Sequence, residues 1–150
     1  MKKKLIALPV FLMLTALGAT TASAQDHTRN WENGYVVQVS EVHIHDGMFN
    51  AYINDLNAGW RKFLEAQKED GDVIRYGIYA ATNPREGEPD LILTVTYKNW
   101  ATFDRGVEYF EELGERVFGS TDNMRSENVN RGELRTLGSS YTLQEVKFTD

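Results

Sequence analysis

The chain lacks cysteine and has only three prolines among its 150 residues. The absence of cysteine excludes disulfide bonds, thiol catalysis, cysteine-ligated metal sites and a lipid-modified N-terminal cysteine. A stable fold must therefore come from packing or from self-association. No glycine-rich phosphate loop, serine-centred nucleophile motif or glycosidase-type carboxylate pair occurs. Short motifs alone therefore assign no reaction to the chain.

Positive charge is scarce outside the N-terminus. The first 24 residues hold three of the sixteen basic residues and none of the 22 acidic ones, so residues 25–150 carry a formal net charge of −9. Such a chain repels phosphate backbones, and no basic stripe compensates for this. We therefore expect no nucleic-acid partner.

The N-terminal segment has the pattern of a secretory signal peptide. Lys2–Lys4 form a basic start, Leu5–Leu17 are mostly apolar, and Ala22-Ser23-Ala24 supplies the small residues of a cleavage site. The apolar run is shorter than the roughly 20 residues of a spanning helix. We expect residues 1–24 to be removed after Ala24, leaving a protein in the periplasm or secreted, with no attachment to the membrane.

Hydrophobic periodicity predicts one α+β domain over residues 35–150, preceded by a flexible arm over residues 25–34. The order is strand, helix, strand, strand, helix, strand, which is a ferredoxin-like split βαβ arrangement. The expected strands are 35–44, 73–81, 91–98 and 141–148, and the expected helices are 49–68 and 101–118. Residues 82–89 are expected to form a hairpin loop, and residues 119–133 show no clear period.

We expect both helices on one face of a four-stranded antiparallel sheet. The alternation in the first and third strands predicts an open second face that is partly polar and partly apolar. Its expected members are Gln38, Ser40, Arg75, Thr94 and Thr96 together with Val36, Val42, Ile44 and Ile92. A second copy of the chain is the simplest cover for such a face, which would make a homodimer with a closed barrel between the subunits.

The order of elements resembles the dimeric α+β barrel superfamily, which includes proteins similar to antibiotic-biosynthesis monooxygenases. The segment Tyr97-Lys98-Asn99-Trp100-Ala101-Thr102-Phe103, where a strand ends in an aromatic residue and a tryptophan opens a helix, carries the same resemblance. The resemblance covers about residues 35–148. The resemblance implies that the relatives of this chain include cofactor-free oxygenases, haem-degrading enzymes or proteins without known activity. Haem-degrading members have a histidine in the second helix, where this chain has Phe110 and no histidine. We therefore expect no cofactor.

Glu41, His43 and His45 alternate along the first strand and are the candidate catalytic residues. A carboxylate and two imidazoles on one face could serve as a general acid–base set or ligate a metal. We assign this face to the helix side, at the mouth of the cleft between helices and sheet. The alternative is a strand that ends in a solvated polar turn, in which case these residues have no chemical role and no metal is bound.

Aromatic residues are expected to line that cleft and to contact a small apolar or aromatic molecule. The predicted ligand-binding residues are Trp60, Tyr76, Tyr97, Asn99 and Trp100. Three hypotheses follow. The first is an exported homodimer that binds a small molecule. The second is a cofactor-independent monooxygenase or isomerase with His43 or His45 as base and Trp100 in the substrate wall. The third is a purely structural dimer.

Overall fold

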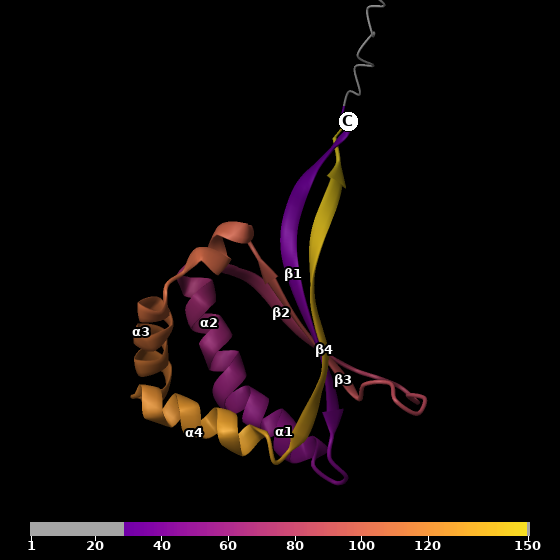
Figure 1. Cartoon of the computed structure of the whole chain (residues 1–150), viewed down its shortest axis with the longest axis vertical. Helices are drawn as coiled ribbons and strands as arrows, with labels where there is room; N and C mark the ends of the chain where they lie inside the picture. Colours follow the sequence, from indigo (N-terminus) through magenta and orange to yellow (C-terminus); the bar gives the residue numbers. More distant parts are fainter. Residues whose placement is uncertain (1–28, 150) are drawn as a thin grey trace, which may run out of the picture.

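The computed structural model describes residues 29–149, which form a four-stranded antiparallel sheet with the helices along one side (Figure 1). The strands lie in the order β2-β3-β1-β4. The elements are β1 (Trp31–Ile44), α1 (Phe49–Asp55), the π-helix η1 (Leu56–Trp60), α2 (Arg61–Glu69), β2 (Val73–Ala80), β3 (Leu91–Tyr97), the 3-10 helix η2 (Trp100–Asp104), α3 (Val107–Phe118), α4 (Thr121–Arg131) and β4 (Arg135–Phe148). The predicted α+β class and the split βαβ order are confirmed.

The β1–β4 ribbon is longer than predicted. Residues 31–34, expected to be part of a flexible arm, begin β1, and β4 begins at Arg135 rather than at Tyr141. The ends pair with each other, since Trp31 lies opposite Phe148. In Figure 1 this ribbon extends beyond the body of the molecule. The predicted signal peptide lies outside the described residues. Within them, no helix has the length and apolar character needed to cross a bilayer.

The helical region after β3 differs from the prediction in two ways. The expected helix over 101–118 is divided, because Arg105 and Gly106 are extended between η2 and α3. Residues 119–133, which show no apolar period, contain α4. Ser120 caps α4 through its Oγ, which accepts a hydrogen bond from the Asn123 backbone N–H at 3.1 Å. The helical layer beside the sheet therefore includes a further helix, α4, which the hydrophobic periodicity did not predict.

The register of β1 reverses the face that we assigned to it. Gln38 pairs with Val95 and Ser40 pairs with Leu93, and directly opposed residues share a face. Val95 and Leu93 belong to the core under the helices. The even-numbered residues of β1 therefore face the helices; they are Val36, Gln38, Ser40, Val42 and Ile44. The prediction that they lie on the open face was wrong. The placement of Arg75, Ile92, Thr94 and Thr96 on the open face agrees with the register.

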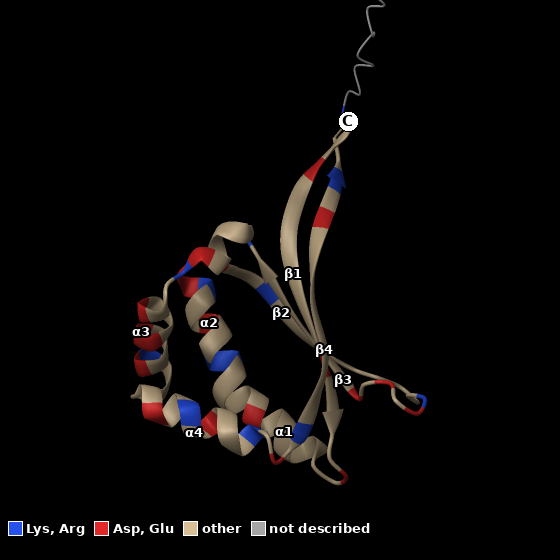
Figure 2. Ribbon diagram, viewed as in Figure 1, with Lys and Arg blue, Asp and Glu red and all other residues tan. Residues whose placement is uncertain are grey.

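The core lies between the sheet and the continuous helical segment α1–η1–α2, as the apolar spacing predicted. One cluster joins Val36, Leu64, Val73, Val95 and Tyr97, and the other joins Val42, Tyr52, Leu56, Leu91 and Leu93. The opposite face has no helix over it among the described residues (Figure 1). Charged residues lie mainly on the helices, the loops and the ends of the β1–β4 ribbon, and few lie in the middle of the sheet (Figure 2).

Candidate ligand site

A cavity of about 310 Å³ lies between the helices and the sheet. Residues of α2, α3, α4, β1 and β3 enclose it. Its apolar wall includes Trp60, Phe63, Leu93, Phe110, Phe118 and Met124. Its polar members are Gln38, Ser40, Gln67, Tyr97, Asn128 and Arg131. The volume is at the small end of the roughly 300–1,000 Å³ found for small-molecule sites, and an apolar wall with a few polar groups is the usual composition of such sites.

The π turn η1 brings the helices together at this cavity. Gly59 lies in the turn, and a Cβ at this position would stand 3.0 Å from Arg131 Nη2 and 3.4 Å from Phe118 Cε1. The absence of a side chain therefore lets residues of α3 and α4 approach the helix closely. Trp60 ends the turn and lines the cavity. Insertions of this kind often occur at functional sites because they redirect side chains.

One buried polar atom of a wall residue has no protein partner. Gln67 of α2 is only 4% exposed, and its Oε1 makes no hydrogen bond within the described residues. Tyr97, by contrast, donates its hydroxyl to Gln38 Oε1 at 3.2 Å. Burial raises the pKa of the Tyr97 hydroxyl, so that side chain is neutral at physiological pH. An unpaired buried carbonyl oxygen is costly to the protein. This oxygen has no accessible surface while the cavity is empty, so it lies beneath the wall and does not face the cavity.

The only charged residue in the cavity wall is compensated. Arg131 of α4 pairs through Nε with Asp55 of α1, and its Nη1 donates to Asn128 Oδ1 at 3.3 Å. The two charged side chains are only 10% and 12% exposed. Buried charges need a partner of this kind, because the interior solvates ions poorly. The pair therefore holds α4 against α1 and leaves the cavity wall without net charge.

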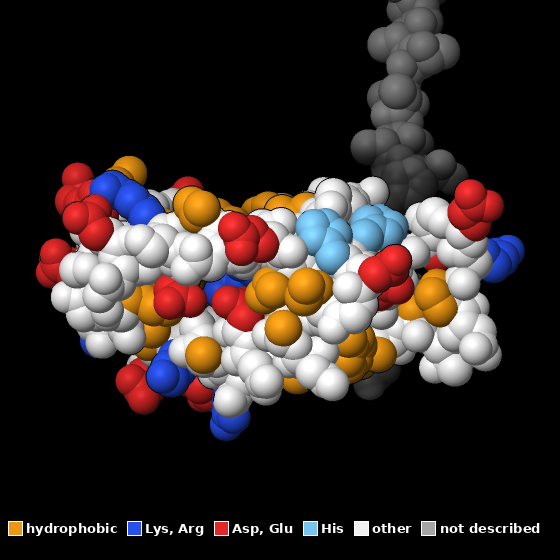
Figure 3. Space-filling model, turned by 90° about the horizontal axis from the view of Figure 1, so that it is seen from below, with side chains coloured by type: hydrophobic (Ala, Val, Ile, Leu, Met, Phe, Trp, Pro, Cys, Tyr) orange, Lys and Arg blue, Asp and Glu red, His pale blue; other side chains and the backbone are white. Residues whose placement is uncertain are grey.

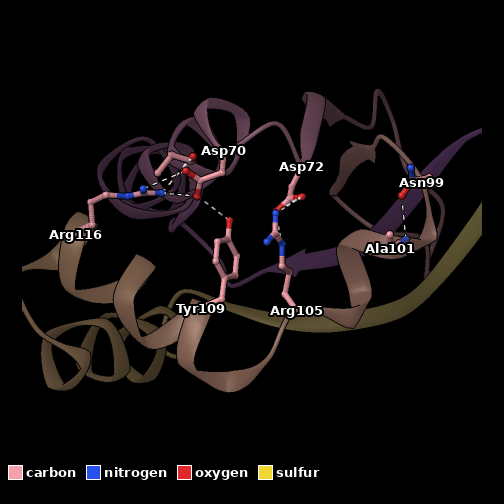
Figure 4. A network of polar contacts seen from close by, with 8 residues as sticks. Asp70, Asp72, Asn99, Ala101, Arg105, Tyr109 and Arg116 are labelled. Carbon is pink, nitrogen blue, oxygen red and sulfur yellow. Dashed lines mark hydrogen bonds and ion pairs between the residues drawn. The ribbon is translucent and has the colours of Figure 1, made fainter.

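A second ionic network holds α3 in place (Figure 4). Asp70, just after α2, accepts from Arg116 Nη2 at 2.6 Å and from the Tyr109 hydroxyl at 2.9 Å. Asp72 accepts two hydrogen bonds from Arg105, both at 3.0 Å. The bond from Arg116 lowers the pKa of Asp70. Burial, followed by the bond to Asp70, raises the pKa of Tyr109. This network fixes the outer wall of the cavity to the segment between α2 and β2.

Two of the five predicted ligand-binding residues, Trp60 and Tyr97, line the cavity. Tyr76 lies next to it, where its ring packs edge-on against Trp60 with centroids 5.4 Å apart. Its hydroxyl donates to Glu65 Oε1 at 2.5 Å, and this bond raises the pKa of Tyr76. Tyr76 therefore supports the wall and does not form part of it.

Asn99 and Trp100 lie outside the cavity. The Asn99 side chain accepts from the Ala101 backbone N–H at 3.0 Å and caps η2. Trp100 is 52% exposed and donates from Nε1 to Gln144 Oε1 at 2.6 Å. Its link to the cavity is indirect, because its ring packs on Phe103 and Phe103 packs on Tyr97. The segment that carries the family resemblance is therefore connected to the site through edge-on and tilted contacts between aromatic rings.

Glu41 and His43 do not lie at the mouth of the cleft, where we had placed them with His45. The register of β1 puts both on the open face, and Glu41 Oε2 accepts from the Ser139 backbone N–H at 3.3 Å. His45 follows β1; its Nδ1 donates to the Glu133 carbonyl at 2.9 Å, and its Nε2 is 3.1 Å from Thr136 Oγ1. Histidine side chains appear at the surface of the lower end of the molecule (Figure 3). No group of three or more potential ligands suited to a metal ion exists within the described residues.

Several cavity residues were missed by the sequence reasoning. Gln67 was absent from the candidates, although it follows Trp60 and Leu64 at intervals of seven and three residues and so shares their helix face. Met124, Asn128 and Arg131 are likewise spaced by four and three residues in α4. This spacing was the available signal. It was overlooked because the inward positions of α4 are mostly polar.

No protein-family model matches the chain, and no curated protein matches it in sequence. Solved structures resemble it in fold. Protein SO0527 from Shewanella oneidensis is 16% identical, with a TM-score of 0.51, and the match covers 78% of this chain and 98% of that protein. A dimeric ferredoxin-like protein from an uncultured marine organism is 15% identical, with a TM-score of 0.51 over 76% of this chain and 96% of that one.

A third solved structure is more distant. SnoaB, a cofactor-independent oxygenase from Streptomyces nogalater, is 10% identical with a TM-score of 0.44, over 73% of this chain and 91% of SnoaB. That similarity is too weak to support a shared function. The two closer matches establish the architecture that the order of elements predicted. The chain therefore has the ferredoxin-like α+β fold, of which the marine protein is a dimeric example.

Proposed function

We propose that the protein is a homodimer that binds a small, partly apolar molecule in the cavity of each subunit. The observation that carries the proposal is the cavity of about 310 Å³, walled by aromatic and aliphatic side chains with a few polar groups such as Gln38, Ser40 and Tyr97. A folded protein gains stability when such a space is filled, because the side chains of its wall then regain contacts. A bound molecule can fill it.

The open face of the sheet supports the homodimer. Its exposed apolar residues include Tyr79 of β2, with 60% of its surface exposed, and Tyr141 and Leu143 of β4, with 44% and 49% exposed. Val37 and Val39 of β1 lie opposite the latter two. Large apolar side chains exposed on a sheet face that no helix covers are typical of an interaction site. The marine protein with the same fold is dimeric, which favours a second copy as the cover.

The geometry does not favour the monooxygenase or isomerase hypothesis in the form that used a histidine base. Glu41 and His43 are on the face of the sheet opposite the cavity, and His45 bonds to the segment before β4. A general base must be within hydrogen-bond reach of the proton that it removes, directly or through a water molecule. A molecule in the cavity is therefore separated from Glu41 and His43 by the sheet.

The test is a thermal-shift screen of uncharged aromatic and lipophilic compounds with the purified protein. A true ligand at about a hundred times its Kd adds about 2.7 kcal/mol to the free energy of unfolding, which gives a clear rise in Tm. The variant Ser40→Leu places a larger side chain in the cavity wall and should abolish that rise. Its matched control is Ser126→Leu, at an exposed position of α4.

Two results would contradict the ligand-binding proposal. One is a complete screen in which no compound raises Tm, which favours the purely structural dimer. The other is a Tm rise that persists in Ser40→Leu, which would place the ligand elsewhere. The homodimer is tested separately by sedimentation velocity. A single subunit at the highest concentration measured would contradict it.

We also propose that the protein acts in the periplasm or outside the cell. The support is the basic, apolar and small-residue pattern of residues 1–24. N-terminal sequencing of the protein recovered from the periplasm or the medium should begin at Gln25. Recovery from the cytoplasm with Lys2–Lys4 intact would contradict this proposal.

A further inference from the structure

We infer that the molecule held in this cavity presents the oxygen of a carbonyl or carboxylate group to the wall, and that Arg131 and Gln38 donate hydrogen bonds to it, given the ligand site proposed above. The polar side chains of the wall are unevenly satisfied. Several of their N–H groups have no partner, whereas their amide oxygens are already bonded or covered.

The three amide side chains of the wall show this imbalance. Gln38 Oε1 accepts from the Tyr97 hydroxyl, and Asn128 Oδ1 accepts from Arg131 Nη1. Gln67 Oε1 has no accessible surface, so a molecule in the cavity does not reach it. The amide nitrogens of the same three side chains have no hydrogen-bond partner among the described residues. The wall therefore offers amide N–H groups but no free amide oxygen.

Arg131 supplies a charged donor to the same wall. Its Nε pairs with Asp55 and its Nη1 donates to Asn128, which leaves Nη2 without a hydrogen-bond partner among the described residues. Nη2 is not one of their fully buried unpaired atoms, so it keeps accessible surface. It lies beside Gly59 and Phe118, where η1 and α3 meet the cavity. A hydrogen bond from a charged donor is stronger than one from a neutral donor.

Gln38 supplies a neutral donor on the floor of the cavity. It is opposite Val95 in the sheet and faces the helices, so its side chain is on the same side of the sheet as the cavity. Its Oε1 is occupied by the Tyr97 hydroxyl at 3.2 Å. With the oxygen engaged, only the Nε2 end of the amide is available to a ligand, and an amide nitrogen can only donate.

The acceptors that remain in the wall are few. No carboxylate of the described residues lines the cavity. The two hydroxyl oxygens are already in contact with other groups, since Tyr97 bonds to Gln38 and Ser40 Oγ is 3.5 Å from Ser140 Oγ. Free donors therefore outnumber free acceptors. A ligand oxygen that accepts a hydrogen bond would pair with groups that otherwise have no partner, which is the larger gain.

Two chemical groups supply such an oxygen, a neutral carbonyl and a carboxylate. The free N–H of the Arg131 guanidinium favours a carboxylate, whereas the Asp55 carboxylate beside it disfavours a second negative charge. Both groups share the acceptor chemistry that the wall complements, and the experiment distinguishes them.

The experiment compares acetophenone, α-methylstyrene and benzoate. The first two have nearly the same shape, but α-methylstyrene has a methylene group in place of the carbonyl oxygen. Benzoate replaces the ketone by a carboxylate. Each probe is titrated into the isotope-labelled, purified protein and followed by two-dimensional NMR. The backbone signals give the Kd, and the side-chain N–H signals of Gln38 and Arg131 report hydrogen bonding at those groups directly.

We expect acetophenone to shift the side-chain N–H signals of Gln38 and Arg131 further than α-methylstyrene does, because the effect of the aromatic ring is common to both probes. Acetophenone should also bind at least as tightly as α-methylstyrene, although a buried carbonyl loses its hydrogen bonds to water. In a cavity without free donors, that loss would make the ketone the weaker ligand.

Two variants test the donors. Gln38→Met removes the neutral donor at nearly constant side-chain volume, and Arg131→Lys removes Nη2 but keeps a positive charge beside Asp55. Each should weaken acetophenone binding about tenfold and leave the affinity for α-methylstyrene unchanged. The matched control is Gln144→Met, at a glutamine of β4 outside the cavity wall, which should change neither affinity. Far-UV circular dichroism establishes that the variants fold. If one does not, the N–H signals of the natural protein still decide.

Benzoate identifies the source of the oxygen. Tighter binding of benzoate than of acetophenone would assign a carboxylate, and weaker binding would assign a neutral carbonyl. Both results support the acceptor class, provided that the N–H signals shift.

Other outcomes would overturn the inference, and they differ from those that overturn the function on which it rests. If α-methylstyrene binds more tightly than both other probes and the N–H signals do not respond to the oxygen, the acceptor class is wrong although the cavity is a ligand site. Unchanged acetophenone affinity in both folded variants would overturn the roles of Gln38 and Arg131. A compound from the wider screen that binds without an acceptor oxygen would also overturn the class. If no probe binds and the screen gives no Tm rise, the ligand-binding function itself is wrong.

Discussion

The two faces of the sheet differ in what covers them. The face under α1–η1–α2 carries the buried clusters and the cavity, with Gln67 and Tyr97 in its wall. The opposite face carries Glu41, His43 and the exposed Tyr79, Tyr141 and Leu143. Both faces mix apolar and polar residues. The helical layer distinguishes the two faces. It covers the polar groups of one face, whereas the polar groups of the other face stay accessible.

This difference shows that one strand contributes side chains to two separate surfaces. β1 alternates between the faces, so Gln38 and Ser40 lie in the cavity wall while Glu41 and His43 point to the open side. The two proposed properties, binding a small molecule and associating with a second copy, would therefore use different side chains of the same strand. Substitutions on one face should leave the property of the other face unchanged.

The largest effect is expected on the covered face, from Trp60→Ala. Trp60 packs against both core clusters and lines the cavity, so its loss should lower the free energy of unfolding by about 3 kcal/mol. The matched variant Trp100→Ala removes a ring that is 52% exposed and one hydrogen bond to Gln144, which should cost about 1 kcal/mol. Urea unfolding measures both. Equal losses would show that the η2 segment is as much a part of the core as the cavity wall.

The next effect is expected on the open face, from Leu143→Glu. Leu143 is 49% exposed in the single subunit, so a charge there is tolerated by the fold but not by an apolar interface between two copies. The dimer Kd should rise by about a hundredfold, which corresponds to a cost of about 2.7 kcal/mol. Sedimentation equilibrium measures it.

The control for this substitution is Val129→Glu, on α4, where 73% of the side chain is exposed. It adds the same charge away from the open face and should leave the dimer Kd unchanged. If both variants dissociate equally, net charge is responsible and the open face is not the interface. If neither dissociates, the second copy binds elsewhere.

A smaller effect is expected from Asp70→Asn in the network that holds α3. The bond from Arg116 lowers the pKa of Asp70 in the folded protein, so its stabilising contribution is present above the unfolded pKa of about 4 and is lost as pH falls through the lower folded pKa. Asp70→Asn should therefore lower stability at neutral pH by about 0.5–1 kcal/mol and flatten the loss of stability between about pH 5 and pH 2. Thermal unfolding across this range measures it.

The matched control is Asp46→Asn, at an exposed aspartate of the turn before α1. It should leave the acid dependence as it is in the natural protein. A steeper loss of stability in Asp70→Asn than in the natural protein would contradict the sign of the Asp70 shift.

Much of the fold was predictable because its signals are local. β3 alternates regularly, with Leu91, Leu93, Val95 and Tyr97 inward, and the structure keeps that assignment. The apolar stripe of residues 49–64 likewise predicted a helix against the sheet. Its π turn was not predicted, because the one extra residue changes the hydrogen-bond pattern without removing the stripe.

The face of β1 was not predictable in the same way. Both sets of alternate residues contain valines and polar side chains: Val37 and Val39 accompany Glu41, while Val36 and Val42 accompany Gln38 and Ser40. Only pairing with β3 decides between the two sets, and this pairing joins residues 49 to 61 positions apart. Because the placement of Glu41 and His43 depended on this choice, the prediction that they lie at the mouth of the cleft was wrong for both.

The smallest effect is expected from His43→Ala, which tests the separation of the two faces directly. His43 is opposite Thr136 on the open side, and the sheet lies between it and the cavity. Its removal should change the Kd of a ligand found in the thermal-shift screen by less than about twofold, as for a substitution away from a site. On the covered face, Ser40→Leu is expected to abolish binding of the same ligand. A tenfold loss of ligand affinity in folded, dimeric His43→Ala would mean that the open face contributes to the ligand site. The hypothesis of a histidine base would then again be compatible with the structure.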